Sequence, residues 1–269
     1  GLNNENKNNY VESIKCKVPY LNGGLFEEID GYDWKKEFLN IPDSIFSNNS
    51  KDGILDVFDL YNFTVDEADD LDKDIGIDPE MLGKVFEKLL PENFRKGKGS
   101  YYTPRPVVNF MTKQVIKNYL ISKENFKNFE KFIYLLINFD FLEEEELILK
   151  ISNFENKSIL NEINKCLENL RVCDPAIGSG AFPVQLMNEV VKIRKNIYKS
   201  LNQEFNSYLL KRNFIENSIY GVDVDKSAVE IAKLRLWLSL IVEETKVNNL
   251  NPLPNLSYKI IQGNSLIQK

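Results

Sequence analysis

The spacing of apolar residues changes near residue 170 of this chain. Before that point apolar residues recur at helical intervals, which predicts mainly helical structure over residues 33–95 and 120–170. The clearest helix follows Asp78-Pro79, an N-cap and a proline in the first turn. Its apolar stripe consists of Met81, Leu82, Val85, Phe86, Leu89 and Leu90. We therefore expect a mainly helical N-terminal lobe over residues 1–94, with a tight turn in the segment 18–26.

Another helix start is indicated at Thr103-Pro104. Thr103 fits the N-cap and Pro104 the first helical position. The buried face of this helix is predicted from its apolar residues, which are Val107, Val108, Met111, Val115 and Ile116. The local sequence is compatible with a capped helix that has no further role. A second interpretation is that the Thr103 hydroxyl and the N–H groups of the helix start bind a carboxylate.

Beyond residue 170 short apolar runs alternate with helical patterns. Strands are predicted at residues 170–174, 218–223 and 258–262, with helices at 181–198 and after Asp225, which fits an N-cap. Strands that alternate with helices form a parallel sheet covered on both faces, so the fold class is α/β. Ligands of such sheets bind at the carboxyl ends of the strands, where three polar or glycine-containing segments lie.

The composition excludes several kinds of site. The chain of 269 residues has no histidine, which removes imidazole bases and histidine zinc motifs. Its three cysteines show no Cys-x-x-Cys spacing, which predicts reduced thiols in a cytoplasmic protein without a metal site. No apolar run approaches the roughly 18 residues that span a bilayer, so no membrane partner is expected. The net charge of −6 argues against a basic DNA-binding face over the whole chain.

The first of the three segments is DPAIGSGAF at residues 174–182. Gly178 and Gly180 allow a sharp strand-to-helix turn and a close approach of the backbone to a ligand. At the second strand end Asp223 can accept both hydroxyls of an adenosine ribose. At the third, Asn264 or Ser265 can bind the adenine edge.

The type of cofactor follows from what these segments lack. Pro183 stands where the dinucleotide fingerprint requires its third glycine. Asp223 also comes 49 positions after Asp174, well past the roughly 20 of that fingerprint. No Gly-Lys-Ser/Thr follows the glycines, so this is not a phosphate-binding P-loop. A cofactor that has an adenosine but no phosphates fits better, and S-adenosylmethionine is such a cofactor.

Together these segments resemble the adenine-N6 DNA methyltransferases of the large fused restriction-modification and phage-defence type. The resemblance rests on YYTP at 101–104, DPAIGSGAF at 174–182, GVDVD at 221–225 with the helix that follows, and GNSL at 263–266. PYLNGGLF at 19–26 is also similar to the segment that precedes these motifs. The resemblance implies a Rossmann-like S-adenosylmethionine methyltransferase fold, with residues 95–269 as its cofactor-binding part.

The resemblance also implies roles for individual residues. Tyr102 and Thr103 would bind the methionine end of the cofactor, while Asp174 and Ala176 would line its methionine and sulfonium region. Asp223 would bind the ribose and Val224 would pack on the adenine, with Asn264 and Ser265 near that ring. The remaining candidates are the glycines and the aromatic residues whose faces could stabilise the sulfonium: Gly178, Gly180, Tyr101 and Phe182.

The family transfers its methyl group with an Asn/Asp/Ser-Pro-Pro-Tyr/Phe motif that holds an adenine rotated out of the DNA. This sequence contains no Pro-Pro. It therefore offers no catalytic residue, and we expect a fragment that binds the cofactor but transfers no methyl group, with DNA bound mostly by other parts of the parent protein. Two alternatives remain open: a non-catalytic Rossmann-like interaction module and, less favoured, an NAD-dependent oxidoreductase.

Overall fold

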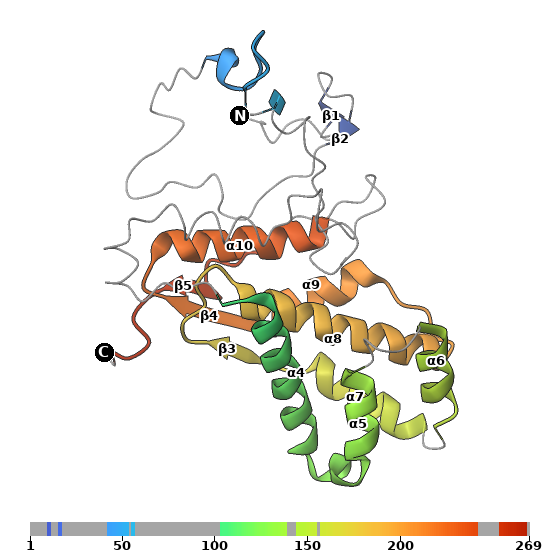
Figure 1. Ribbon diagram of the computed structural model, residues 1–269. Coiled ribbons are helices and arrows are strands. Elements are labelled where there is room, and N and C mark those ends of the chain that lie inside the picture. The colour runs from blue at the N-terminus through green and yellow to red at the C-terminus, as the bar shows by residue number, and fades with distance from the viewer. Residues whose placement is uncertain are drawn as a thin grey trace.

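The computed structural model describes residues 10–11, 16–17, 42–53, 55–56, 103–138, 144–154, 157–241 and 253–267 (Figure 1). In the N-terminal part they include a short antiparallel pair, β1 (Tyr10–Val11) and β2 (Cys16–Lys17), and the 3-10 helix η2 (Asp43–Ile45). The predicted turn at 18–26 and the helix after Asp78-Pro79 lie outside the described residues. The helical N-terminal lobe over 1–94 and the domain boundary therefore stay predictions.

The predicted parallel sheet is confirmed. Its strands are β3 (Val172–Asp174), β4 (Ile219–Asp223) and β5 (Ile260–Gln262), hydrogen-bonded in the order β3-β4-β5. All pairs are parallel, with Asp174 opposite Gly221 and Asp223 opposite Gln262. Each strand ends at the predicted residue and begins one or two residues later than predicted. Because the strands are parallel and in this register, the loops that follow them meet at one edge of the sheet.

Helices make up most of the remaining described chain. They are α4 (Arg105–Ile121), η3 (Glu124–Phe129), α5 (Glu130–Ile137), α6 (Glu144–Ser152), α7 (Lys157–Glu168), α8 (Ala181–Ser200), α9 (Ser207–Asn217) and α10 (Lys226–Ile241). The sequence pattern did not predict α9. Asn206 caps it by accepting a hydrogen bond from the Leu209 N–H at 3.0 Å, and its buried residues include Phe214 and Ile215.

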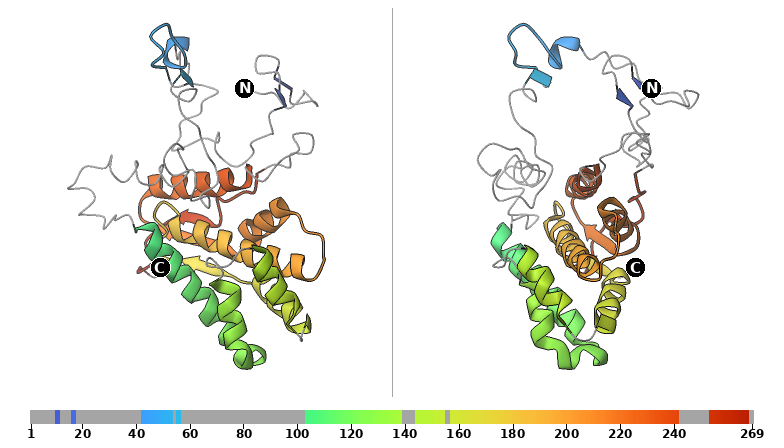
Figure 2. Two further views of the ribbon diagram at one scale, coloured as in Figure 1. Left: turned by 45° about the vertical axis from the view of Figure 1, so that its right-hand side comes forward. Right: turned by 90° about the vertical axis from the view of Figure 1, so that its right-hand side faces the viewer.

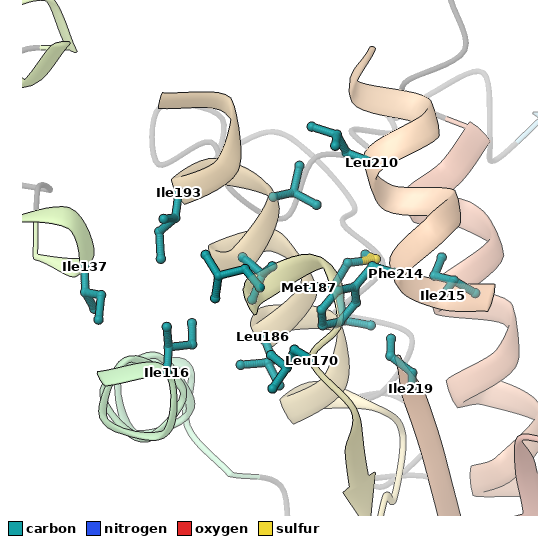
Figure 3. Close-up of a cluster of buried hydrophobic side chains, with 14 of the residues drawn as sticks. Ile116, Ile137, Leu170, Leu186, Met187, Ile193, Leu210, Phe214, Ile215 and Ile219 are labelled. Atoms are coloured by element: carbon teal, nitrogen blue, oxygen red, sulfur yellow. The ribbon is translucent and has the colours of Figure 1, made fainter. Parts of the chain in front are cut away.

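Helix α8 is the centre of the core. It lies between α10 on one side and α4 and α5 on the other in all three views (Figures 1 and 2). Its buried residues face α4, α9 and the sheet, and Met187 points toward Phe214 of α9 (Figure 3). Burial of these side chains fixes the start of α8, which is also the end of the loop after β3.

The structure corrects two predictions about α4. Thr103 is not the N-cap, because the helix begins at Arg105 and the Pro104 carbonyl accepts its first backbone hydrogen bonds, from Val107 and Val108. Pro106 then stands in the first turn, where an N–H would have no partner within the helix. Of the predicted buried face only Val108 and Ile116 are buried, and the face is completed by Thr112, Lys113 and Leu120. Val107, Met111 and Val115 are about half exposed, because α8 packs on the neighbouring stripe.

The corrected face gives a direct test. We expect Ile116→Ala to lower the free energy of unfolding by about 2–5 kcal/mol, because the side chain is fully buried and its loss leaves a cavity. Val115→Ala is the matched control. Its side chain is 51% exposed, so the loss should stay within about 0.5 kcal/mol. Urea unfolding followed by circular dichroism measures both values, and equal losses would contradict the assigned face.

Candidate functional site

Three loops meet at the carboxyl ends of the parallel strands. The first follows β3 and contains the glycine turn, by which we mean residues 177–180. The second is Val224 and Asp225 after β4, and the third is residues 263–266 after β5. The predicted site residues described in these loops and at the start of α8 are Asp174, Ala176, Gly178, Gly180, Phe182, Asp223, Val224, Asn264 and Ser265.

The Asp223 carboxylate joins the first two loops. Its Oδ2 accepts a hydrogen bond from the Gly178 N–H at 2.8 Å, and its Oδ1 accepts one from the Asp225 N–H at 2.9 Å. The Ile177 N–H adds a third bond, from the first loop to the Val222 carbonyl of β4 at 3.0 Å. Gly178 and Asp223, which are 45 positions apart in the sequence, are thus in direct contact.

The two glycines of the turn have different roles. Both have positive φ, +53° at Gly178 and +84° at Gly180, which other residues rarely adopt. A Cβ on Gly180 would lie 3.1 Å from the Cβ of Ala232, so this glycine also permits close packing against α10. Among the described residues, no atom lies within 4 Å of a Cβ placed on Gly178. No described residue therefore packs on the Gly178 side of the turn, which we call its open side.

The start of α8 offers hydrogen-bond donors next to this open side. Within the described part of the chain, the backbone N–H groups of Ser179, Ala181 and Phe182 have no acceptor. Gly180, the N-cap of α8, has no side chain that could supply one. Free N–H groups and the helix dipole together favour an anionic group at this position.

The third loop is tied to the other two by side chains. The Ser265 hydroxyl donates to the Pro175 carbonyl, and the Gln262 amide donates to the Val224 carbonyl at 3.1 Å. Asn264 turns inward on its own loop, where its Oδ1 accepts from the Leu266 N–H at 3.0 Å. Gln262 was not among the predicted site residues, because nothing in the sequence around a glutamine at a strand end indicates this contact.

Asp174 lies beside the turn in an environment that disfavours its charge. Desolvation raises the pKa of this carboxyl above its ordinary value, and the neighbouring Asp223 carboxylate raises it further. A hydrogen bond from the Ala176 N–H to Asp174 Oδ1, 3.1 Å long, acts in the opposite direction. A cation bound at this position would relieve the repulsion between the two carboxylates.

The other candidates are placed as follows. Asp225 caps α10 as predicted, because its Oδ1 accepts from the Ser227 N–H at 2.9 Å. Thr103 is half-buried ahead of α4, and its hydroxyl makes no hydrogen bond within the described ranges. Tyr101 and Tyr102 lie outside the described residues. The part of the chain that the structure covers contains no cluster of three metal-ligating side chains, and none of its helices is long and apolar enough to cross a membrane.

Comparisons with known proteins give a family model and a solved structure that match this chain in part. Residues 150–267 match the family model of the MmeI DNA-methyltransferase domain. A solved structure of the Type IIL restriction-modification enzyme MmeI in complex with DNA covers 71% of this chain and 23% of its own, with 22% identity and a TM-score of 0.45.

Two curated relatives extend the similarity over most of the chain. One, from Methanocaldococcus jannaschii, carries the name of a type II restriction enzyme and methyltransferase and is 36% identical over 93% of this chain. The other, DNA methyltransferase A of Bacillus subtilis, is 26% identical over 87%. The chain spans about a fifth of the length of each, 21% in both cases. The resemblance to the DNA methyltransferases of restriction-modification systems that the motifs indicated is thus confirmed, and the chain is a relative of these enzymes.

Proposed function

We propose that the three loops bind S-adenosylmethionine and that this chain is the cofactor-binding part of an adenine-N6 DNA methyltransferase. The observation that carries the proposal is the contact between Asp223 and Gly178, which brings a ribose acceptor next to an open glycine turn. The kinship with restriction-modification methyltransferases supports the choice of cofactor. S-adenosylmethionine supplies the methyl group, and the residues described here bind and orient it.

Asp223 retains the acceptors that a ribose requires. A carboxylate offers about four lone-pair positions, two on each oxygen. The N–H groups of Gly178 and Asp225 use one position on each oxygen. One position on each oxygen is left, which matches the two hydroxyl donors of a ribose. The bonds that hold the loops together are therefore compatible with binding.

The remaining polar groups suit the methionine end of the cofactor. The N–H groups of Ser179, Ala181 and Phe182 can bind its carboxylate at the start of α8. Asp174 can stabilise its positive charges, because a nearby cation offsets the cost of this desolvated carboxylate. The predicted contacts of Val224, Asn264 and Ser265 with the adenine, and of Tyr101, Tyr102 and Thr103 with the methionine, are part of this proposal.

Methyl transfer itself requires groups that this sequence does not contain. Without a Pro-Pro motif we propose that the 269 residues bind S-adenosylmethionine but do not methylate DNA. DNA binding and adenine specificity are proposals for the whole protein. Incorporation of labelled methyl groups into DNA by the purified chain would contradict the proposal that the 269 residues do not methylate DNA.

The cofactor is tested by replacing Asp223. We expect the chain to bind S-adenosylmethionine and Asp223→Ala to weaken binding roughly a hundredfold, because two hydrogen bonds to a charged group are lost. Titration calorimetry measures both affinities. Glu230→Ala is the matched control, since it removes a half-exposed carboxylate of α10 that pairs with Lys233 and lies outside the three loops, so the affinity should not change. A folded chain that binds no S-adenosylmethionine would favour the interaction module, and binding of NADH instead would favour the oxidoreductase.

Asp174 gives a prediction with opposite effects on stability and binding. Asp174→Asn should stabilise the folded chain at pH 7, because it removes a carboxylate whose pKa is raised on folding while the amide oxygen can still accept from Ala176. The same variant should bind S-adenosylmethionine more weakly. The stabilisation should vanish well below pH 4, where the carboxyl is protonated in both states, and grow as pH rises through the folded-state pKa. Thermal unfolding at pH 3 and pH 7 checks the sign, and a destabilised variant at pH 7 would contradict it.

A further inference from the structure

Arg235 is a buried cation of α10 that contacts the glycine turn. Only 2% of its surface is exposed, and it lies in α10 between the apolar residues Leu234 and Leu236. Its guanidinium NH1 donates to the Ser179 carbonyl at 3.0 Å. Ala232, one helical turn earlier, is the residue against which Gly180 packs. One face of α10 thus contacts two consecutive residues of the turn.

The bond from Arg235 holds the peptide group between Ser179 and Gly180. The Ser179 carbonyl and the Gly180 N–H belong to the same planar peptide. The Gly180 N–H donates to the Ile177 carbonyl at 2.9 Å, so that this peptide is bonded at both ends. Its orientation in turn determines where the free N–H groups of Ser179 and Ala181, on either side of it, can point.

The opposite end of the turn is held in a similar way. The Ile177 carbonyl accepts from Gly180, and the Gly178 N–H donates to Asp223. Within the described residues, the peptide between Gly178 and Ser179 has no hydrogen bond at either end. The turn is therefore fixed by Asp223 from one side and by Arg235 from the other, and the peptide between the two anchors is available to a ligand.

We propose that Arg235 is a positioning residue that holds the glycine turn in its ligand-binding conformation. This inference rests on the proposed function, because the ligand it concerns is S-adenosylmethionine. Arg235 does not touch the ligand in this arrangement. It acts through the Ser179 carbonyl. Without this bond the peptide can turn over by rotation about ψ of Ser179 and φ of Gly180, because glycine restricts φ little.

The structure offers a matched control in Arg194. This arginine of α8 is equally buried, at 2% exposed, but it donates to Asn164 at 2.8 Å and to Tyr198. Within the described residues it makes no hydrogen bond to the turn. Arg194→Met and Arg235→Met both remove a buried guanidinium of similar size. Both should lower stability, whereas only Arg235→Met should change the turn and the affinity.

The experiment compares the two variants with the unmodified chain by calorimetry with S-adenosylmethionine and by amide hydrogen exchange without it. We expect Arg235→Met to bind at least about tenfold more weakly and to exchange the Gly180 amide faster at temperatures where the protein is folded. Arg194→Met should bind within about twofold of the unmodified chain, with unchanged exchange at Gly180. If Arg235→Met does not fold, Arg235→Gln, which is too short to keep the contact from the same backbone position, is measured in its place.

The outcomes separate this inference from the proposed function. If the unmodified chain binds S-adenosylmethionine and the Arg235 variant binds it with the same affinity, only the positioning role is overturned. Equal losses of affinity in the Arg194 and Arg235 variants would also overturn it, because the effect would then be one of general stability. No binding of S-adenosylmethionine by the folded unmodified chain would overturn the proposed function and this inference together.

Discussion

The arrangement of the site depends on the carboxylate of Asp223, which bonds the backbone of two loops at once. It connects the tip of β4 to the glycine turn after β3 and to the start of α10. Each of these bonds has a charged acceptor, which makes it stronger than a bond between neutral groups. Because the loops leave a parallel sheet at the same edge, a side chain at the tip of the middle strand can reach the loop after β3 as well as the loop that follows its own strand. The sheet places Asp223 at this edge, and its carboxylate connects the two loops.

Packing and polar contacts cooperate around this connection. On the buried side Gly180 lies against Ala232, and Arg235 donates to the Ser179 carbonyl of the peptide that precedes Gly180. On the open side Gly178 leaves room, and the first N–H groups of α8 have no acceptor among the described residues. The turn is thus rigid where it meets the core and accessible where a ligand would approach. The two glycines of this motif are therefore needed for different reasons: Gly180 allows close packing against α10, and Gly178 leaves the other side of the turn open.

The sequence predicted the features that local chemistry determines and missed those that depend on distant contacts. The strand ends were predictable, because apolar runs stop at Asp174 and Asp223, and so was the cap at Asp225. The buried face of α4 was not, since Val107, Met111 and Val115 form a second apolar stripe and only the position of α8 decides between them. Arg235 and Gln262 contact carbonyls 56 and 38 positions away, so their local sequence gives no sign of either contact.

The central claim is that three strand-end loops form one adenosine site around Asp223. The most direct measurement is a crystal structure of this chain grown with S-adenosylmethionine. We expect both ribose hydroxyls within hydrogen-bonding distance of the Asp223 carboxylate, with the bond from the Gly178 N–H still in place. A cofactor bound away from the three loops, or Asp223 separated from Gly178 in that complex, would contradict it.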